Sequence, residues 1–383
     1  MWLLSSCSSY DLPDARNAFY QGNYQQAEEE IGTDVVDGKD SVLVLMERGT
    51  IYQAEGEYEK SSMDFIRAYD TLDVLQTYSV SEGAGSWVIN DTVYSFEGSP
   101  YEQTLLHSMT AMNHLAMGNW EDGGVEARRI IFSLTEEERG EEYPDDAFSR
   151  YLAAFILEMT GDGPNARSQY KMANELLPDL HIDEKGQISS EESASSTASV
   201  QGQELVVFFL IGHSPTMREI RGQFKDSFHP PQIQVYTKEK YLGNATVLSR
   251  VDNLALITWN IEAPARIAKM VARIAAKEAI AVSVEKQDAV LGALTRIILI
   301  GMLERPDFRR WETLPRWLAV ARLPCPETLN SFEVAIQGEG NIMGKRFAID
   351  YPIVKRGDVF FSFVRDLPGF NSPKLKKEID KVQ

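Results

Sequence analysis

A glycine closely followed by an aromatic residue recurs along the first half of the chain, and this recurrence constrains the fold more than any other feature. The first copy is Gly22-Asn23-Tyr24, and the second is Gly56-Glu57-Tyr58. Glycine adopts the left-handed backbone conformation that ends a helix and starts a tight turn. Each copy therefore predicts the turn between two antiparallel helices.

The stretch Ser41–Asp70 around the second copy has the composition of a helix pair. Gly49 and Ala68 are small enough for two helices to approach closely, whereas Tyr52 and Phe65 fill the space between them. The two copies are separated by the period of tetratricopeptide (TPR) repeats, whose helix pairs stack into a solenoid with a concave face. This period favours a solenoid, and a plain helical bundle is the alternative.

Two further turns extend the pattern. Gly118 is followed by Asn119 and Trp120, which repeats the first copy, and Gly161 marks the fourth turn. Both turns keep the TPR phase if a long insertion precedes Gly118 and a short one precedes Gly161. We predict four helix pairs within residues 7–178. The longer insertion, near residues 75–100, contains a predicted β-hairpin over Ser86–Tyr94.

After these pairs the helical periodicity stops. Residues 179–202 are rich in serine and poor in apolar side chains, which predicts a flexible linker. The apolar run Glu204–Gly212 predicts a buried central strand, and Ala263–Leu303 predicts helix with Pro264 in its first turn. Other strands are predicted over Pro231–Thr237, Ala245–Val251, Trp317–Leu323, Ser331–Gln337, Arg346–Tyr351 and Asp358–Val364.

The predicted fold class is therefore α+β. A TPR-like α-solenoid at the N-terminus is followed by a mixed α/β domain over residues 203–370 with a largely antiparallel sheet, and residues 371–383 form a polar tail. A chain of 383 residues with 43% hydrophobic residues can bury a core in each domain.

The charge and the cysteines exclude several classes of protein. A net charge of −19 argues against sequence-independent binding to nucleic acid, and it disfavours adsorption onto anionic lipid. Two cysteines, Cys7 and Cys325, provide neither a disulfide framework nor a thiolate metal cluster. The apolar run Ala289–Leu303 contains Arg296 and is shorter than the roughly 20 residues that span a bilayer, so we expect no transmembrane helix.

The N-terminus carries a processing signal. Leu4-Ser5-Ser6-Cys7 resembles the lipobox of bacterial lipoproteins, in which the cysteine receives the lipid. We expect residues 1–6 to be the remnant of a signal peptide that lacks its basic start and most of its apolar segment. Ser8 after the cysteine resembles the signal for the outer membrane. The alternative is an ordinary apolar terminus in which Cys7 is incidental.

Several motifs in both halves carry a resemblance to a known family: Pro100–His107, Asn113–Leu115, Gly118–Asn119, Val125–Arg129, Asp307–Pro315 and Ala319–Arg322. Together they resemble one family of uncharacterised bacterial TPR-containing outer-membrane lipoproteins, similar in context to penicillin-binding-protein activator lipoproteins. The resemblance implies a role in the cell envelope and no established catalysis. This chain departs from the pattern in its short signal peptide and at Gly123-Gly124, where a TPR prefers alanine.

Two histidines are candidate metal ligands. His107 and His114 share one side of a predicted helix, but only Glu102 and Glu126 are near enough to complete a site. Packed or surface histidines are the more economical interpretation, and we expect no metal and no cofactor. The sequence also lacks HExxH, CxxC, phosphate-loop and Ser-His-Asp patterns, so no enzyme is predicted.

Several side chains are predicted to bind a protein partner. Arginine and tryptophan are typical of interface hot spots. Glu126, Arg128 and Arg129 have an alternative interpretation as intramolecular ion pairs, and the group around Trp311 has one as a structural joint. The predicted partner-binding residues are Tyr52, His107, Asn113, Glu126, Arg128, Arg129, Arg309, Arg310 and Trp311.

The leading hypothesis is a lipid-anchored periplasmic scaffold that binds a protein partner through the solenoid groove. The acidic run Glu136–Asp146 either attracts a basic partner or is a solvated loop. A second hypothesis is a glycan-binding or glycan-active protein whose site lies in the C-terminal domain near Trp311. A third is a structural component that assembles with itself as a homo-oligomer.

Overall fold

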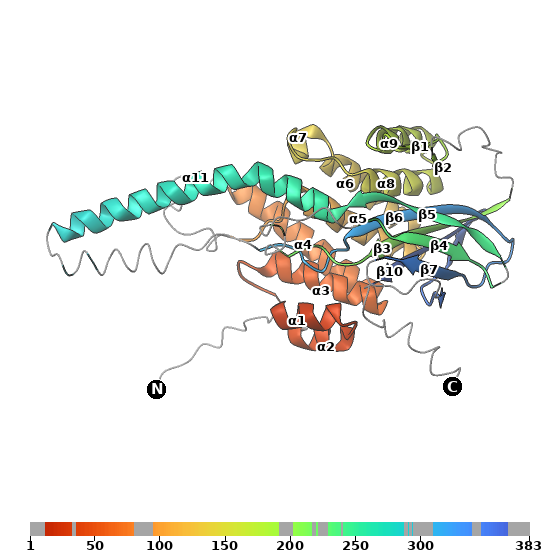
Figure 1. Cartoon of the computed structure of the whole chain (residues 1–383), viewed down its shortest axis with the longest axis horizontal. Helices are drawn as coiled ribbons and strands as arrows, with labels where there is room; N and C mark the ends of the chain where they lie inside the picture. Colours follow the sequence, from red (N-terminus) through yellow and green to blue (C-terminus); the bar gives the residue numbers. More distant parts are fainter. Residues whose placement is uncertain are drawn as a thin grey trace.

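The computed structural model describes residues 12–32, 36–79, 95–190, 202–216, 220, 229–238, 240–286, 290, 293, 309–338 and 346–366. Its architecture is mixed α+β, with helices packed on a large sheet (Figure 1). Cys7, the signal remnant 1–6, the hairpin Ser86–Tyr94 and the tail 371–383 lie outside the described residues.

Four helix pairs form where the turn glycines predict them. Each turn glycine has a positive φ, which is +71° at Gly22, +85° at Gly56, +77° at Gly118 and +91° at Gly161. The pairs are α1 (Leu12–Tyr20) with α2 (Tyr24–Ile31), α3 (Ser41–Glu55) with α4 (Tyr58–Ser79), α5 (Pro100–Ala116) with α6 (Trp120–Ser133), and α8 (Ala147–Met159) with α9 (Gly163–Glu175); the short helix α7 (Glu136–Arg139) precedes the last pair.

The predicted close approach within the second pair is confirmed. A Cβ atom added at Gly49 would lie 2.4 Å from Cε1 of Phe65, so only glycine fits beside this ring. A buried polar chain then links the second pair to the third. Gln53 Nε2 donates to Asn113 Oδ1 at 2.7 Å, and Asn113 Nδ2 donates to Ser61 Oγ at 2.8 Å. These bonds satisfy polar groups that would be costly to bury alone.

The sheet has eight strands in the order β8-β7-β4-β5-β6-β3-β10-β9. The apolar run predicted as a central strand is β3, whose last seven residues are buried. Of the strand pairs that the structure describes, β3 with β10 is parallel and the others are antiparallel. The strands are β3 (Gln203–Ile211), β4 (Gln232–Tyr236), β5 (Tyr241–Arg250), β6 (Trp317–Cys325), β7 (Glu333–Gln337), β8 (Phe347–Ala348), β9 (Val354–Arg356) and β10 (Val359–Asp366).

The sheet covers the inner face of the helix pairs. Phe208 of β3 lies 5.6 Å from Phe148, and Phe361 of β10 lies 6.0 Å from Trp120, both measured between ring centroids. Tyr58, which follows a turn glycine, is 5.6 Å from Phe363. Most buried apolar side chains of the described residues form one continuous cluster across helices and sheet. The face that the solenoid interpretation left open to a partner is thus packed against the chain's own strands.

Part of the predicted linker is ordered. Strands β1 (Leu180–Ile182) and β2 (Ile188–Ser190) pair antiparallel, and Tyr151 Oη donates to the carbonyl of Gly186 in their turn at 2.5 Å. The flexible-linker prediction is wrong for this segment because alternating apolar residues, such as the buried Ile182, pack on the last helix pair. Residues 191–201 lie outside the described part.

The predicted start of the long helix is also wrong. Helix α11 (Val251–Glu285) begins directly after β5, well ahead of Ala263, and contains Pro264 in its interior. Proline removes one backbone donor and is tolerated where the helix bends or faces solvent, and Pro264 is exposed. None of the described helices is both long and apolar enough to cross a membrane.

We predict that Gly49→Ala destabilises the protein by about 1–2 kcal/mol. Overpacking against Phe65 costs about 1–3 kcal/mol, and the helix propensity of alanine offsets about 1 kcal/mol of this loss. The free energy of unfolding from urea denaturation measures the effect.

Gly124→Ala in α6 is the matched control. The nearest atom to an added Cβ there is Cγ2 of Thr160 at 3.6 Å, an ordinary contact, so this variant should be more stable by up to about 1 kcal/mol. Equal stability of the two variants would contradict the proposed close approach.

Candidate functional site

Buried carboxylates hold one segment of the chain between the helices and the sheet. We name the segment Arg309–Thr313, together with Glu47 of α3 and Glu102 of α5, the buried joint. The two glutamates are each 1% exposed. A charged group is buried at this depth only when its hydrogen bonds are supplied by the protein.

Glu47 connects three parts of the joint. Its Oε1 accepts from Nε of Arg16 at 2.9 Å and from the backbone N–H of Glu312 at 2.9 Å, while its Oε2 accepts from the N–H of Thr313 at 3.2 Å. Arg16 also donates to the carbonyl of Arg310 at 2.7 Å. One carboxylate therefore ties the first helix pair, the second pair and the segment before β6 together.

Glu102 binds the same segment from the other side. Its Oε1 accepts from the N–H of Trp311 at 2.7 Å, and its Oε2 accepts from the N–H of Ser99 at 2.7 Å, which completes a capping box at the start of α5. Burial raises the pKa of Glu102, whereas the nearby Arg310 guanidinium and the backbone donors lower it.

Trp311 and its arginine neighbours are part of the joint rather than of an open surface. Trp311 is fully buried, and its Nε1 donates to Thr50 Oγ1 at 3.0 Å. Arg310 Nη2 donates to Tyr101 Oη at 2.9 Å, and Arg309 Nη1 lies 2.6 Å from Asp40 Oδ1. The structural joint that the sequence offered as an alternative is the arrangement found, and we do not assign Arg310 or Trp311 to a surface that meets a partner.

The predicted residues of α5 and α6 form a second buried cluster. His107 Nδ1 lies 2.9 Å from Glu126 Oε2, and Arg129 Nη1 donates to Glu126 Oε1 at 2.7 Å. The Arg129 guanidinium also lies 4.8 Å from the centroid of the Tyr69 ring. The intramolecular ion pair is therefore present for Glu126 and Arg129. His107, Glu126, Asn113 and Tyr52 are all buried.

The outer side of α6 is exposed and mixes apolar with basic residues. Val125 and Phe132, two helical turns apart, are 46% and 62% exposed. Between Val125 and Phe132 in the sequence, Arg128 is exposed and Arg129 is half-buried. Arg128 Nη1 donates to the carbonyl of Gly124 in the same helix at 3.0 Å. We name Val125, Arg128, Arg129 and Phe132 the α6 face. Residues three, four and seven apart share one side of a helix, so the four side chains lie together.

A pocket of about 440 Å³ lies between the start of α8, the end of β5 and the first turns of α11. The carboxylate of Asp146 lines this pocket and is buried. Asp146 is the N-cap of α8, and its Oδ2 accepts from the N–H of Ser149 at 3.0 Å. Trp317 is covered by the Arg250 guanidinium at 5.0 Å from its centroid, so its ring offers no stacking surface to a sugar. Apolar walls come from Leu176, Leu177, Val247, Leu248, Leu254 and Ile257.

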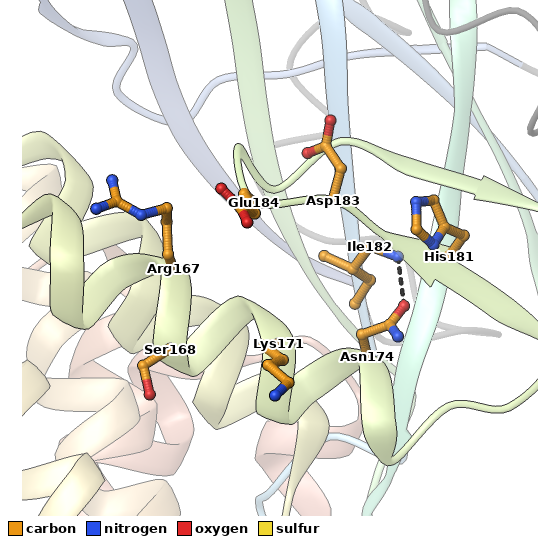
Figure 2. A pocket seen from close by; sticks show the side chains of 8 residues that line it. All are labelled: Arg167, Ser168, Lys171, Asn174, His181, Ile182, Asp183 and Glu184. Atoms are coloured by element: carbon orange, nitrogen blue, oxygen red, sulfur yellow. Dashed lines mark hydrogen bonds between the residues drawn. The ribbon is translucent and has the colours of Figure 1, made fainter.

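A second pocket, of about 500 Å³, separates α9 from the β1 strand and its turn (Figure 2). Asn174 Oδ1 accepts from the N–H of Ile182 at 2.7 Å and fixes the strand to the helix. The charged heads of Arg167, Lys171 and Glu184 point in different directions in this view. They do not converge on one point where a ligand atom would react.

Within the described residues, no group of three or more histidine, cysteine or acidic side chains is arranged to hold a metal ion. Comparison with family models, curated proteins and solved structures finds no match.

Sequence reasoning missed Glu47 and Glu102 as the residues on which the joint depends. A signal was present for both. Glu47 directly follows the apolar run Val42–Met46, and a charge on so apolar a helix indicates a buried partner. Glu102 stands three residues after Ser99, the spacing of a capping box. Phe132 of the α6 face was also missed, although its distance of two helical turns from Val125 predicts a shared side.

We predict that Glu47→Gln destabilises the protein by about 3 kcal/mol. The amide keeps one acceptor oxygen, and its NH₂ group faces a donor, so Arg16 or a backbone N–H is left buried without an acceptor. The free energy of unfolding measures the loss.

Glu57→Gln is the control, because the side chain of Glu57 lies in an exposed pair with Lys60 at 3.7 Å. This variant should change stability by less than about 1 kcal/mol. A Glu47 variant as stable as this control would contradict the role of the joint.

We predict a pH-dependent effect at Asp146. Burial raises the pKa of this carboxyl, and the neighbouring Asp145 charge adds to the rise. The folded protein therefore binds this proton at a higher pH than the unfolded chain does, so the contribution of Asp146 to stability falls as pH rises from about 4 through the raised pKa. Asp146→Asn keeps the cap without the buried charge. It should be at least as stable as the parent protein at neutral pH, and the difference should shrink on acidification.

Asp146→Ala separates the cap from the charge. It loses the acceptor for the Ser149 N–H, which costs about 1 kcal/mol. Thermal denaturation of the three proteins across this pH range provides the comparison. An asparagine variant that is less stable than the parent at neutral pH and equal to the alanine variant would contradict the pKa assignment.

Proposed function

We propose that the protein is a lipid-anchored periplasmic scaffold of the bacterial cell envelope that holds a protein partner. Cys7 in its lipobox context supports the anchor. The four helix pairs, with turn glycines in the TPR phase, support an origin as TPR-like repeats, which commonly bind proteins. The proposal includes no catalysis, since the sequence lacks the HExxH, CxxC and phosphate-loop patterns.

The partner surface that we propose is the α6 face. The inner face of the helix pairs is packed against the sheet, so a partner must meet another side. The observation that carries this assignment is Phe132, a large apolar side chain that is 62% exposed two turns from Val125. An aromatic residue beside two arginines is typical of an interface hot spot. The fitting partner is a segment with apolar residues flanked by carboxylates.

The surroundings of Trp311 argue against a glycan site at that residue. The indole is fully buried and packs 5.6 Å from the Phe65 ring, within a filled core. We therefore propose no second function there. Self-assembly remains a separate hypothesis, which measuring the mass of the delipidated protein in solution tests.

We predict that a photoreactive amino acid in place of Phe132 forms a defined cross-linked adduct in intact cells. The same probe in place of Met172, an exposed apolar residue of α9 that is 40% exposed, should form none. Adding Arg128→Glu should lower the adduct yield about tenfold or more, because a hot-spot arginine contributes on the order of 2 kcal/mol. Denaturing gel electrophoresis of membrane fractions measures the yield.

Arg128 suits this test because its side chain is exposed and donates only to a carbonyl of its own helix among the bonds described. Cys7→Ser in the same cells separates anchoring from binding, since it should release the protein from the outer-membrane fraction. Equal adducts from positions 132 and 172, or an adduct unaffected by Arg128→Glu, would remove the α6 face as the partner surface.

A further inference from the structure

One oxygen of the Asp146 carboxylate has no hydrogen-bond partner within the described residues. Asp146 is only 3% exposed, and its Oδ2 accepts from the N–H of Ser149, whereas its Oδ1 accepts from no group there. Burial raises the pKa of this carboxyl and the hydroxyls of Ser149 and Ser249 counter the rise, but neither hydroxyl is bonded to Oδ1. A buried acceptor without a donor is costly, so this oxygen calls for a group that the described residues do not supply.

Asp146 lines the pocket of about 440 Å³ between α8, β5 and α11. A water molecule takes up about 30 Å³ of the liquid, so the pocket is much larger than the one water that would satisfy Oδ1. Its volume lies within the range of small-molecule sites, which is about 300–1,000 Å³. Such sites combine apolar walls with a few polar groups that fix the orientation of the ligand. The leucines, Val247 and Ile257 provide the walls here, and Asp146 provides the buried polar group.

The other charged residues that line this pocket are compensated by the protein itself. Asp145 Oδ2 lies 2.8 Å from Arg150 Nη2, and Arg250 Nη2 lies 3.1 Å from Asp252 Oδ2. Asp146 forms no such ion pair with any cation in the part of the chain that the structure describes. The ionised pocket therefore carries one negative charge in excess, which favours an occupant that brings a positive charge.

We propose that this pocket binds a small organic cation in which a primary ammonium group is attached to an apolar body. The ammonium group donates to Oδ1 of Asp146, and its other two N–H donors can reach the hydroxyl of Ser249, which also lines the pocket. The apolar body packs on the leucine-rich walls. A ligand with a carboxylate head is disfavoured because it would face Asp146. The inference uses no residue of the α6 face, so it does not rest on the proposed function.

Isothermal titration calorimetry of the full chain with three probes of equal chain length tests the head group. The probes are heptylamine, 1-heptanol and heptanoate. Heptylamine should bind, and the alcohol and the carboxylate should bind about tenfold more weakly or less, because only the ammonium group forms a charge-assisted hydrogen bond with Asp146. Equal affinity for the three probes, tighter binding of heptanoate, or no binding of heptylamine at millimolar concentration would overturn the proposal.

Asp146→Asn identifies the acceptor. The amide oxygen keeps the cap of α8, while an NH₂ group takes the place of Oδ1 and turns an acceptor into a donor. The affinity for heptylamine should fall about tenfold or more, and circular dichroism checks that the variant is folded. Undiminished binding of heptylamine by the folded variant would show that Asp146 is not the acceptor and would overturn the proposal.

Ile257→Trp tests the apolar wall and leaves the carboxylate in place. Ile257 lines the pocket and is half-buried, so an indole at this position fills part of the space and should abolish the binding of heptylamine. Ile267→Trp is the matched control, because Ile267 lies on the same helix, is 56% exposed and does not line the pocket. This control should bind heptylamine as the parent does. Equal affinity of the two tryptophan variants would place the probe outside this pocket and overturn the proposal.

Discussion

The structure depends on two buried carboxylates that bind backbone N–H groups of a distant segment. Glu47 and Glu102 accept from three consecutive N–H groups, those of Trp311, Glu312 and Thr313. Burying a carboxylate is unfavourable unless donors replace its water, so these helices and this segment need each other. Because the segment leads directly into β6, the same bonds attach the sheet to the helix pairs. The helical part and the sheet thus share one core.

Local features of the fold were predictable because their causes are local. A turn glycine needs its positive φ whatever surrounds it, and Gly49 must be small because Phe65 lies on the facing helix of the same pair. Which strand residues pack on the inner face of the helix pairs was not predictable. Tyr58 and Trp120 follow turn glycines and look like helix-pair residues, yet their rings pack on Phe363 and Phe361 of β10. Both contacts depend on the order of the strands in the sheet, which a local sequence pattern does not predict.

The candidate site likewise has features that the local sequence predicts and features that it does not. Arginine beside glutamate on α6 indicated ion pairing, and Glu126 indeed binds Arg129 and His107. Whether a side chain faces inward depends on the neighbouring helix, so Glu126 is buried while Arg128, two positions later, is exposed. Composition alone made Trp311 look like a docking residue. Its burial follows from Glu102, far earlier in the chain, which binds its backbone N–H.

Net charge was the weakest guide, because it sums charges that do not act together. The value of −19 disfavours adsorption on anionic lipid only if the acidic groups approach the surface with the basic ones. On helix α11, for example, Lys277 is buried and Arg266 pairs with Glu262 at 2.7 Å, so neither acts as an isolated surface charge. The charges that matter for a contact are therefore those of a single surface. On the α6 face these are Arg128 and Arg129 beside Val125 and Phe132, although the chain as a whole is acidic.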